Sequence, residues 1–474
     1  MFRDGGASGA YARRMARVVV CGAGTCGLIT AMLLADDGHE VVVVERDPME
    51  PPAPADAWEV WERRGVNQFR LAHFLMSRFR YDLVRELPRL IDALAAAGAY
   101  EFNFFGPFRD VIPDPERFDV ITARRPVLEA VVAEVARQTP RVEVRRGVGI
   151  ASLTTGTSTK QGIPHVTGVV TESGETIAAD VVVAATGRRS PLSRWLVDAG
   201  ARAPYETEED SGFVYYGRYM RSSDGTQAMH SPHLGDYGSI GLLALPADHG
   251  TVGVGIISFS GDAALRTLRH EEPWRRVFSA LPGAAPLVDL EPMSDIVAMG
   301  SIEDRYRRFV VDGEPVATGV FAVADAWAAT NPTLGRGISL GVKHAILLRD
   351  HLRAADGSPY DQALAWDDVT EREMTPWYDT TVWHDRHKVA EYIAAAGAGP
   401  AVDDDRWVRF CSVQRLFQGD LDLALRWVDR SAFLSSPPNA LLDDPEILAK
   451  IENAPPPSDH DGPTREQLLE LAAR

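Results

Sequence analysis

The sequence predicts an α/β protein built on a parallel sheet, and three observations carry this prediction. Residues 17–45 have the pattern of a strand, a glycine-rich turn, a helix and a second strand, which together make a βαβ unit with parallel strands. From residue 212 to 260 the pattern changes to short strands that favour a separate sheet. Residues 357–445 have a helical pattern. We therefore expect a parallel α/β part, a β-rich part and a helical C-terminal part.

The α/β part can be divided into elements. We expect a buried strand at residues 17–21, a helix at 28–37 that stops at Gly38, and a strand at 40–45. Helical periodicity extends over residues 67–97 and again over 125–138. The second of these helices precedes a predicted strand pair at 142–150 and 166–171. A continuous apolar strand at 180–185 then meets Thr186 and Gly187.

The remaining elements follow in order. Strands are predicted at 213–219, 240–245 and 251–258, the last two joined by a turn at 246–250, and a further strand at 319–324 precedes a long helix at 338–354. Five of the ten tryptophans lie within residues 357–445, so we expect that helical region to be packed. Residues 455–463 have the composition of a linker, and Thr464 with Gln467 predicts a capping box for a last short helix. Because Met15 directly precedes a strand pattern, residues 1–14 are expected to be a frayed extension or to reflect an upstream start codon.

Composition excludes several function classes. With 49 Lys and Arg against 67 Asp and Glu, the net charge is −18, which disfavours a nucleic-acid partner. No apolar run approaches the roughly 18 to 20 residues that cross a bilayer, and the first residues lack the apolar stretch of a secretory signal. The three cysteines have no metal-site spacing and fit a reducing compartment. We therefore expect a cytoplasmic protein with no transmembrane segment and no metal.

The glycine-rich turn is the first motif that carries chemistry. Gly22, Gly24 and Gly27 lie between a strand and a helix, and Glu45 ends the next strand. In such a turn the first glycine allows the tight bend, the second lets a pyrophosphate approach the backbone, and the third allows close packing of helix on strand. The carboxylate can accept from ribose hydroxyls. This pattern predicts a dinucleotide site, and Glu45 favours FAD or NAD over NADP.

Two further segments resemble motifs of the flavoprotein monooxygenase family that includes para-hydroxybenzoate hydroxylase and squalene epoxidase. The first is residues 180–194, in which Thr186 replaces the family's aspartate before Gly187. The second is residues 319–341, which contain Asp325, Pro332 and a Gly-x-Gly sequence. Here Ala324 stands where the family has glycine and Ser339 where asparagine is common. Apart from the family, a carboxylate at Asp325 can accept from sugar-alcohol hydroxyls, and the glycine N–H groups can stabilise charge on a reduced flavin.

The resemblance implies a glutathione-reductase-type fold with a single Rossmann-type FAD-binding domain and a parallel sheet. That domain would comprise residues 15–200 and 301–355, with a helical insertion at about 60–115. A β-sheet substrate domain at 201–300 and a helical region at 356–474 would complete the chain. The residues expected to contact FAD are Gly22, Gly24, Gly27, Glu45, Arg46, Arg125, Ile150, Thr186, Gly187, Asp325, Pro332, Gly335, Arg336, Gly337 and Ile338.

The same resemblance implies a function. An FAD-dependent monooxygenase would insert one oxygen atom from O₂, by way of a flavin C4a-hydroperoxide, into a hydrophobic small molecule by aromatic hydroxylation or alkene epoxidation in specialised metabolism. Because Thr186 replaces aspartate, the electron donor stays open between NAD(P)H and a partner flavin reductase. The catalytic residues are not identifiable from the sequence. The candidates for the pocket are His73, Tyr215, Arg218 and Pro332.

Other functions compete with this one. The scaffold also supports dehydrogenases or reductases of lipid-like substrates, and a flavin-binding sensor without turnover stays open. A flavin-dependent halogenase is less favoured, because residues 46–159 contain no lysine and Trp58 and Trp61 have the wrong spacing. A disulfide reductase is excluded because there is no second glycine-rich unit, and Cys21 and Cys26 lie in the strand and the turn. The sequence is compatible with a monomer and with a homodimer.

Overall fold

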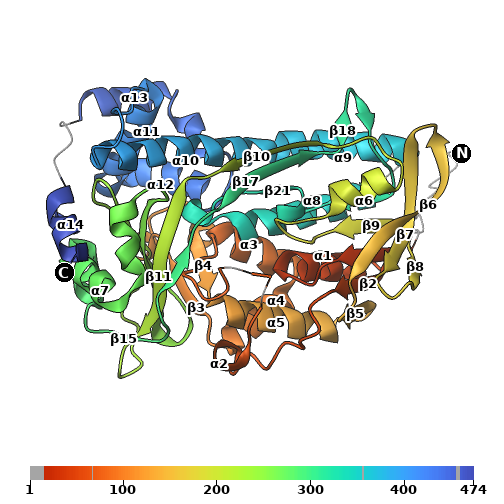
Figure 1. Ribbon diagram of the computed structural model, residues 1–474, viewed down its shortest axis with the longest axis horizontal. Helices are drawn as coiled ribbons and strands as arrows, with labels where there is room; N and C mark the ends of the chain where they lie inside the picture. Colours follow the sequence, from red (N-terminus) through yellow and green to blue (C-terminus); the bar gives the residue numbers. More distant parts are fainter. Residues whose placement is uncertain (1–14, 64, 67, 355–356, 455–459, 474) are drawn as a thin grey trace, which may run out of the picture.

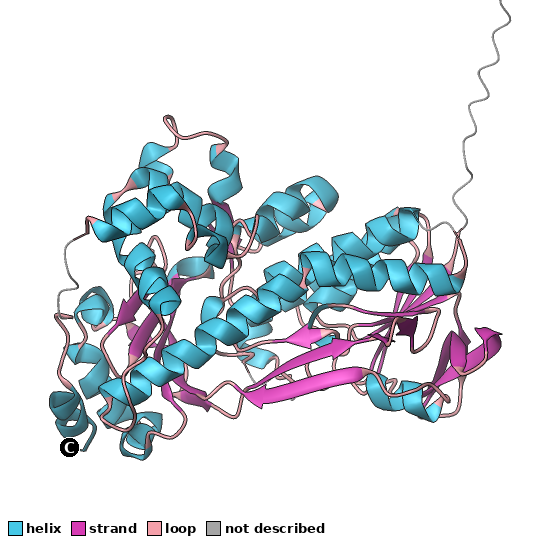
Figure 2. Cartoon of the chain, turned by 90° about the horizontal axis from the view of Figure 1, so that it is seen from above, coloured by secondary structure: helices cyan, strands magenta, loops and turns pink. Residues whose placement is uncertain are grey.

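The computed structural model describes residues 15–63, 65–66, 68–354, 357–454 and 460–473. The predicted extension at 1–14 and residues 455–459 of the predicted linker lie outside this part. Figure 1 places a parallel sheet and a larger antiparallel sheet at opposite ends of the molecule, with the strand pair β10 and β17 running between them. Figure 2 shows helices running lengthwise past both groups of strands.

The parallel sheet has five strands in the order β20-β9-β1-β2-β5. The predicted βαβ unit is confirmed, since β1 and β2 are parallel neighbours joined by α1. β9 pairs with the other side of β1, so the strand order reverses there, and in such sheets ligands bind beyond the carboxyl ends of the strands at this point. The elements are β1 Arg17–Cys21, α1 Thr25–Asp36, β2 Glu40–Glu45, β5 Val142–Arg146, β9 Val181–Ala184 and β20 Val320–Ala322.

The two faces of this sheet are covered differently. Helices cover one face and bury Val18, Val20, Val41 and Val43, which point to that side because strand residues alternate. A three-stranded antiparallel sheet and α6 cover the other face, against Val19 and Cys21. The covering elements on the first face are α1, α3 Ser77–Glu86, α4 Pro88–Ala96, α5 Arg125–Gln138 and α8 Gly337–Ala354. Those on the second face are β6 Ile150–Lys160, β7 Ile163–Thr171, β8 Thr176–Ala178 and α6 Leu192–Asp198.

The predicted helix at 67–97 is wrong as a single element. Residues 68–76 contain no helix, and Pro88 starts a second helix because its ring cannot continue the first. Met76 donates from its backbone N–H to Ser339 Oγ at 3.0 Å, which ties the extended stretch to α8. Leu71 and Phe74 are buried individually along this stretch, and their spacing imitates helical periodicity.

The predicted strand pair at 142–150 and 166–171 is also wrong in its partners. β5 ends at Arg146 and joins β2 in the parallel sheet, whereas β7 pairs with β6 in a hairpin. The hairpin turns at Gly162, whose φ of +80° suits glycine. The sequence therefore contained three strands where the pattern indicated two.

The antiparallel sheet confirms the predicted β-rich stretch. Its strands lie in the order β12-β13-β14-β11-β15, and β16 also pairs with β11. The pair β10 and β17, with β21, forms a separate ribbon. The elements are β10 Tyr205–Asp210, β11 Phe213–Arg221, β12 His233–Asp236, β13 Gly241–Pro246, β14 Thr251–Phe259, α7 Glu271–Ala280, β15 Glu291–Pro292, β16 Val297–Met299, β17 Glu303–Arg308 and β21 Ala328–Ala329. Minor elements are α2 Ala57–Val60, the pair β3 Tyr100–Asn103 and β4 Asp119–Thr122, and the pair β18 Val310–Val311 and β19 Glu314–Pro315.

The C-terminal region is helical and packed, as predicted. Trp407, Phe410 and Trp427 form the core of its outer part. The capping box is present, since Thr464 N–H donates to Gln467 Oε1 at 2.8 Å and Gln467 N–H donates to Thr464 Oγ1 at 3.3 Å. Across the described residues, every helix falls short of the length and apolar character that crossing a bilayer requires. The helices are α9 Pro359–Glu373, α10 Thr375–Ala395, α11 Asp405–Leu416, α12 Leu421–Ser431, α13 Pro445–Glu452 and α14 Arg465–Ala473.

Candidate functional site

The glycine-rich turn combines two glycines that the fold requires with one that leaves space open. Gly22 has a φ of +111°, and a Cβ there would lie 2.5 Å from the carbonyl oxygen of Ala185 on the neighbouring strand end. A Cβ on Gly27 would lie 2.1 Å from the carbonyl oxygen of Gly22. Gly24 differs, because its φ of −76° suits any residue and no atom lies within 4 Å of its ideal Cβ. The N-terminus of α1 therefore faces open space at Gly24.

Glu45 anchors a chain of alternating charges beside this turn. Its Oε2 accepts from the N–H of Ala23 at 2.8 Å and lies 3.4 Å from Arg63 Nη2. Arg63 also bonds Glu129 at 2.6 Å, and Glu129 accepts from Arg125 Nε at 2.7 Å. Although burial opposes it, the two arginines lower the pKa of Glu129. These alternating charges hold Arg125 at the start of α5, on the same side of the sheet as the turn.

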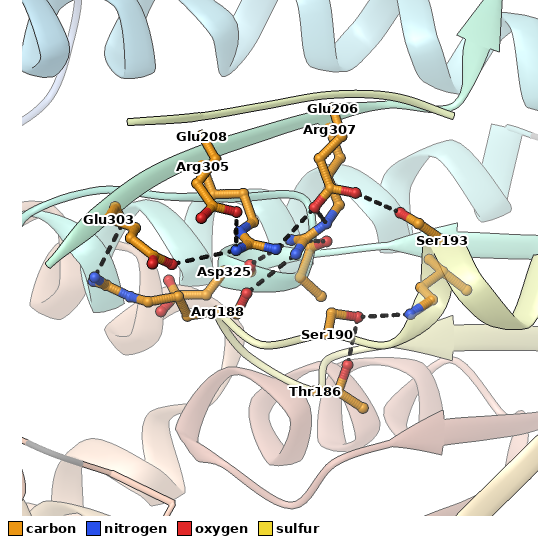
Figure 3. A network of polar contacts seen from close by, with 12 residues as sticks. Thr186, Arg188, Ser190, Ser193, Glu206, Glu208, Glu303, Arg305, Arg307 and Asp325 are labelled. Carbon is orange, nitrogen blue, oxygen red and sulfur yellow. Dashed lines mark hydrogen bonds and ion pairs between the residues drawn. The ribbon is translucent and has the colours of Figure 1, made fainter. Parts of the chain in front are cut away.

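The loop after β9 is tied down by its own hydroxyls and by a neighbouring strand. Thr186 Oγ1 donates to Ser190 Oγ at 2.6 Å, so this hydroxyl is engaged within the loop (Figure 3). Arg188 donates to the carbonyl oxygens of Glu303 and Thr330, at 3.2 and 2.9 Å. These bonds hold the loop against β17 and β21.

Arg307 connects this loop to the segment that carries Asp325 (Figure 3). Its side chain is completely buried on β17. Nη2 donates to the carbonyl oxygen of Arg188 at 3.2 Å, and Nη1 donates to that of Ala326 at 3.1 Å. Nε donates to Glu206 Oε1 at 3.0 Å, which supplies the opposite charge. One guanidinium thus fixes the spacing between two segments that sequence motifs assigned to the cofactor.

Asp325 follows β20 in a short turn whose geometry explains how alanine replaces glycine before it. Ala324 has a φ of +51°, and its N–H donates to His344 Nδ1 at 3.1 Å. His344 is fully buried, and burial lowers its pKa to about 3, so the ring is neutral and can accept this bond. The ring stacks on Trp366 at 5.1 Å. A histidine on α8 therefore stabilises a backbone conformation that glycine adopts without support.

The loop before α8 brings a second helix N-terminus to the same place. Pro332 begins a 3₁₀ turn that ends at Leu334, Gly335 follows with a φ of +64°, and α8 starts at Gly337. No atom lies within 4 Å of an ideal Cβ on Gly337. A Cβ on Gly341 would lie 2.4 Å from Cys26 Sγ, so α8 packs closely on the start of α1. Two helix N-termini, each with backbone N–H groups and a positive dipole end, thus face one region.

A single cavity of about 690 Å³ joins these segments. Among the residues predicted as site residues, its lining includes Gly24, Gly27, His73, Arg125, Gly187, Tyr215, Asp325, Pro332, Gly335, Arg336, Gly337 and Ile338. The described lining does not include Gly22, Glu45, Arg46, Ile150, Thr186 or Arg218. Gly22 and Thr186 instead shape the loops whose neighbours line the cavity. Glu45 and Arg46 lie at the end of β2, and Ile150 begins β6.

The cavity extends from the two helix N-termini into an apolar chamber. Its walls come from the stretch before α3, from the antiparallel sheet and from the C-terminal helices, through Leu71, Phe74, Met76, Phe104, Leu243, Leu245, Met299, Phe410, Phe417 and Trp427. His73 lines the chamber, and burial lowers its pKa to about 3, so it is uncharged at neutral pH. The C-terminal helices, whose role the sequence left open, therefore form part of the wall.

Arg218 does not belong to the chamber, contrary to the prediction. Tyr215 and Gly217 of β11 line the cavity, and Arg218 points to the opposite face because strand residues alternate. There it bonds Glu271 at 2.6 Å and the carbonyl oxygen of Ser294 at 2.9 Å. Arg218 thus forms a structural ion pair with Glu271 on the face of the antiparallel sheet that points away from the cavity.

Sequence reasoning missed the polar residues at the chamber's inner end. The hydroxyl of Tyr215 donates to Asn331 Oδ1 at 2.8 Å and lies 2.5 Å from Thr333 Oγ1. Thr381 and His384 of α10 also line the cavity. Asn331 and Thr333 flank Pro332 and could have been singled out for that reason. The α10 residues lie within a tryptophan-rich helix that signals packing alone.

The chain matches no family model. It is 29% identical over 364 residues to Protein Rv3254 of Mycobacterium tuberculosis, covering 72% of this chain and 73% of that protein.

Solved structures share the fold at low identity. PqsL from Pseudomonas aeruginosa, described as a probable FAD-dependent monooxygenase, has a TM-score of 0.59 at 18% identity, covering 79% of this chain and 96% of its own. A flavoprotein/dehydrogenase from Cytophaga hutchinsonii has a TM-score of 0.58 at 16% identity, with 93% and 99% covered. The enzyme 2-methyl-3-hydroxypyridine-5-carboxylic acid oxygenase has a TM-score of 0.55 at 17% identity, with 80% and 93% covered. The chain therefore has the fold of the FAD-dependent monooxygenases.

Proposed function

We propose that this chain binds one FAD and is a monooxygenase that inserts one oxygen atom from O₂ into a hydrophobic small molecule. The observation that carries the proposal is the single cavity, which begins at two helix N-termini and continues into an apolar chamber. The first part suits a dinucleotide and the second a substrate. Such a site is what a flavin reaction with an apolar partner requires.

The residues present fit FAD. Gly24 and Gly337 leave open space where a Cβ would meet nothing, which is the form of a cradle for a closely approaching ligand. The N-terminus of α1 would hold the pyrophosphate, with Arg125 beside it, and Glu45 would accept from the adenosine ribose. Asp325 would accept from the ribityl hydroxyls. The N–H groups at the start of α8 would face the ring, where their dipole stabilises negative charge.

When bound and reduced, FAD supplies the activation of O₂. The chain's own contribution is to orient the substrate and exclude water. The apolar walls from β11, β13 and the C-terminal helices do both. His73 and His384 are neutral in the wall because burial lowers the pKa of each to about 3, so neither brings a charge that would hold water in the chamber.

Aromatic hydroxylation and alkene epoxidation both belong to this proposal. The chamber's aromatic walls suit either kind of flat apolar substrate. Among the structural neighbours, PqsL is known in complex with 2-aminobenzoylacetate, and the pyridine carboxylic acid oxygenase acts on an aromatic ring by its name. We favour an aromatic substrate for this chain on the same grounds. The electron donor is either NAD(P)H or reduced flavin from a partner reductase, and anaerobic mixing with NADH and with NADPH distinguishes the two.

A glycine pair tests FAD binding sharply. Gly24→Val keeps an allowed backbone conformation and meets no protein atom, but it fills the space where the pyrophosphate would lie. Gly106→Val is the matched control, since Gly106 is exposed and its Cβ also meets nothing. We expect wild type and Gly106→Val to bind one FAD per chain with equal Kd, and Gly24→Val to bind at least 100-fold more weakly at unchanged Tm. A folded wild type that takes up no FAD refutes the proposal.

Oxygen insertion needs a separate test. The FAD-loaded protein would be reduced and supplied with ¹⁸O₂ and a panel of hydroxylated aromatic acids and alkenes. Label in an organic product supports a monooxygenase. Label found only in hydrogen peroxide, together with an oxidised substrate, supports a dehydrogenase or oxidase instead.

A further inference from the structure

One arginine in the cavity wall has hydrogen-bonding capacity that the protein does not use. Arg336 lies between Gly335 and Gly337 and is 5% exposed. Its Nη2 donates to Thr381 Oγ1 at 3.0 Å, and its Cζ lies 5.4 Å from the ring centroid of Trp377 on α10. Its Nε is buried without any hydrogen-bond partner in the described structure. Because guanidinium groups are normally saturated with acceptors when buried, the protein leaves part of this group unsatisfied.

The charge of Arg336 is also uncompensated. Within the described part of the chain, no carboxylate oxygen forms an ion pair with it. The acidic group that acts on it is Asp385 on α10, and burial raises the pKa of that carboxyl to about 8, which leaves it protonated at neutral pH. Burial lowers the pKa of Arg336 only to about 10, so the guanidinium stays charged. A buried charge of this kind is costly unless an anion joins it.

The other arginines of the wall are already engaged. Arg125 is bonded to Glu129, and Arg188 donates to two backbone carbonyls. Arg336 differs from both, because the one hydrogen bond of its side chain among the described residues is to the hydroxyl of Thr381. Trp377, Phe410 and Trp427 line the same cavity and give it aromatic surface.

We infer that Arg336 binds the carboxylate of an aromatic substrate and so fixes which end of that substrate faces the flavin region. A guanidinium offers two parallel N–H groups, which match the two oxygens of a carboxylate. The aromatic walls would take the ring. This inference rests on the proposed function, which assigns the chamber to the substrate. It narrows the substrate class to aromatic acids.

The first experiment compares two probes of the same shape. Binding of 1-naphthoate and of its neutral analogue 1-naphthamide is measured by calorimetry on the wild-type protein, with and without added FAD. We expect naphthoate to bind at least tenfold more tightly than naphthamide. Equal binding of the two probes, or tighter binding of the amide, overturns the inference without any variant being needed. Failure of FAD to bind is read separately, from the FAD titration, and bears on the proposed function.

Variants then assign the effect to Arg336. Arg336→Gln should weaken the binding of naphthoate at least tenfold and keep the affinity for naphthamide within twofold of wild type. Arg336→Lys should recover part of the naphthoate affinity. Arg305→Gln, which removes a charge outside the cavity, should change neither the naphthoate affinity nor the naphthamide affinity. If Arg336→Gln weakens FAD at least tenfold while naphthoate binding is unchanged, the charge serves the cofactor and the inference is wrong.

Discussion

The side chain of Arg307 donates to the carbonyl oxygen of Ala326 at 3.1 Å, while the same guanidinium bonds the carbonyl of Arg188. Neither residue is near Arg307 in sequence. The loop after β9 and the turn that carries Asp325 each follow one of two paired strands, β9 and β20. Because three backbone carbonyls converge on one buried cation, small shifts of either segment break hydrogen bonds in the other (Figure 3).

Arg307→Gln should therefore weaken both stability and FAD binding. Removing one partner of a buried charged network costs about 3 kcal/mol of unfolding free energy, because the carbonyls lose their donors. Arg305→Gln is the matched control on the same strand, whose ion pairs with Glu206 and Glu208 are partly exposed and are worth less than about 1 kcal/mol. Urea unfolding and FAD titration of the two variants check this. Equal effects of the two substitutions would contradict the positioning role.

Asp325→Ala should weaken FAD without unfolding the protein. A carboxylate that accepts from sugar-alcohol hydroxyls contributes about 1.5 to 3 kcal/mol, which corresponds to a roughly 10- to 100-fold rise in Kd. The FAD affinity of Asp325→Asn should fall between those of wild type and Asp325→Ala, since the amide keeps one acceptor oxygen. Asp350→Ala on the exposed side of α8 serves as the control. Unchanged FAD affinity in Asp325→Ala would show that the carboxylate does not contact the cofactor.

The buried carboxyl of Asp304 should make the stability of the protein depend on pH. Its Oδ1 accepts from the N–H of Asn331 at 2.6 Å, while Oδ2 is buried and has no hydrogen-bond partner among the described residues. Burial raises the pKa of Asp304 from 3.8 to about 7. Between these values the folded chain holds a proton that the unfolded chain has released, so this group makes stability fall as pH rises from about 4 to about 7.

Asp304→Asn removes this titration and keeps the shape. Wild type should lose unfolding free energy as pH rises from 5 to 8, and the variant should not. The difference in unfolding free energy, variant minus wild type, should therefore increase over this range by a few kcal/mol, since each unit of pKa shift is worth about 1.4 kcal/mol. Urea unfolding at both pH values measures the difference. The prediction fails if wild type and variant respond to pH in the same way.

Much of the fold was predictable, and the failures have identifiable physical causes. The βαβ unit, the strands of the antiparallel sheet and the helical C-terminal region were predicted because each has a repeating pattern that burial enforces. The stretch at 68–76 was mistaken for helix because Leu71 and Phe74 are both buried at a spacing of three residues, although the backbone there is not helical. Arg218 was placed in the chamber because alternation along a strand does not say which face is inward.

The site shows the same division. Gly24, Asp325 and Gly337 were predicted because a strand end or helix start fixes where they lie. Arg307 was missed because its role depends on carbonyl groups brought together by the fold, and carbonyls carry no sequence signal. Arg336 was predicted to contact the cofactor by its place between two glycines, and this stays a prediction. The hydrogen bond of its side chain to Thr381 on α10 could not be read from the sequence.

The chamber can be filled from within the antiparallel sheet. Gly255 lines the cavity opposite Leu243 on the paired strand, and an ideal Cβ there has no neighbour nearer than 3.8 Å. Gly255→Leu should therefore fold at least as well as wild type, since leucine suits a strand better than glycine. It should keep FAD affinity within twofold and weaken 1-naphthoate at least tenfold, because the side chain occupies the ring's place. Gly255→Ala should change naphthoate binding little. If Gly255→Leu displaces FAD instead, the apolar chamber and the cofactor site are not arranged as proposed.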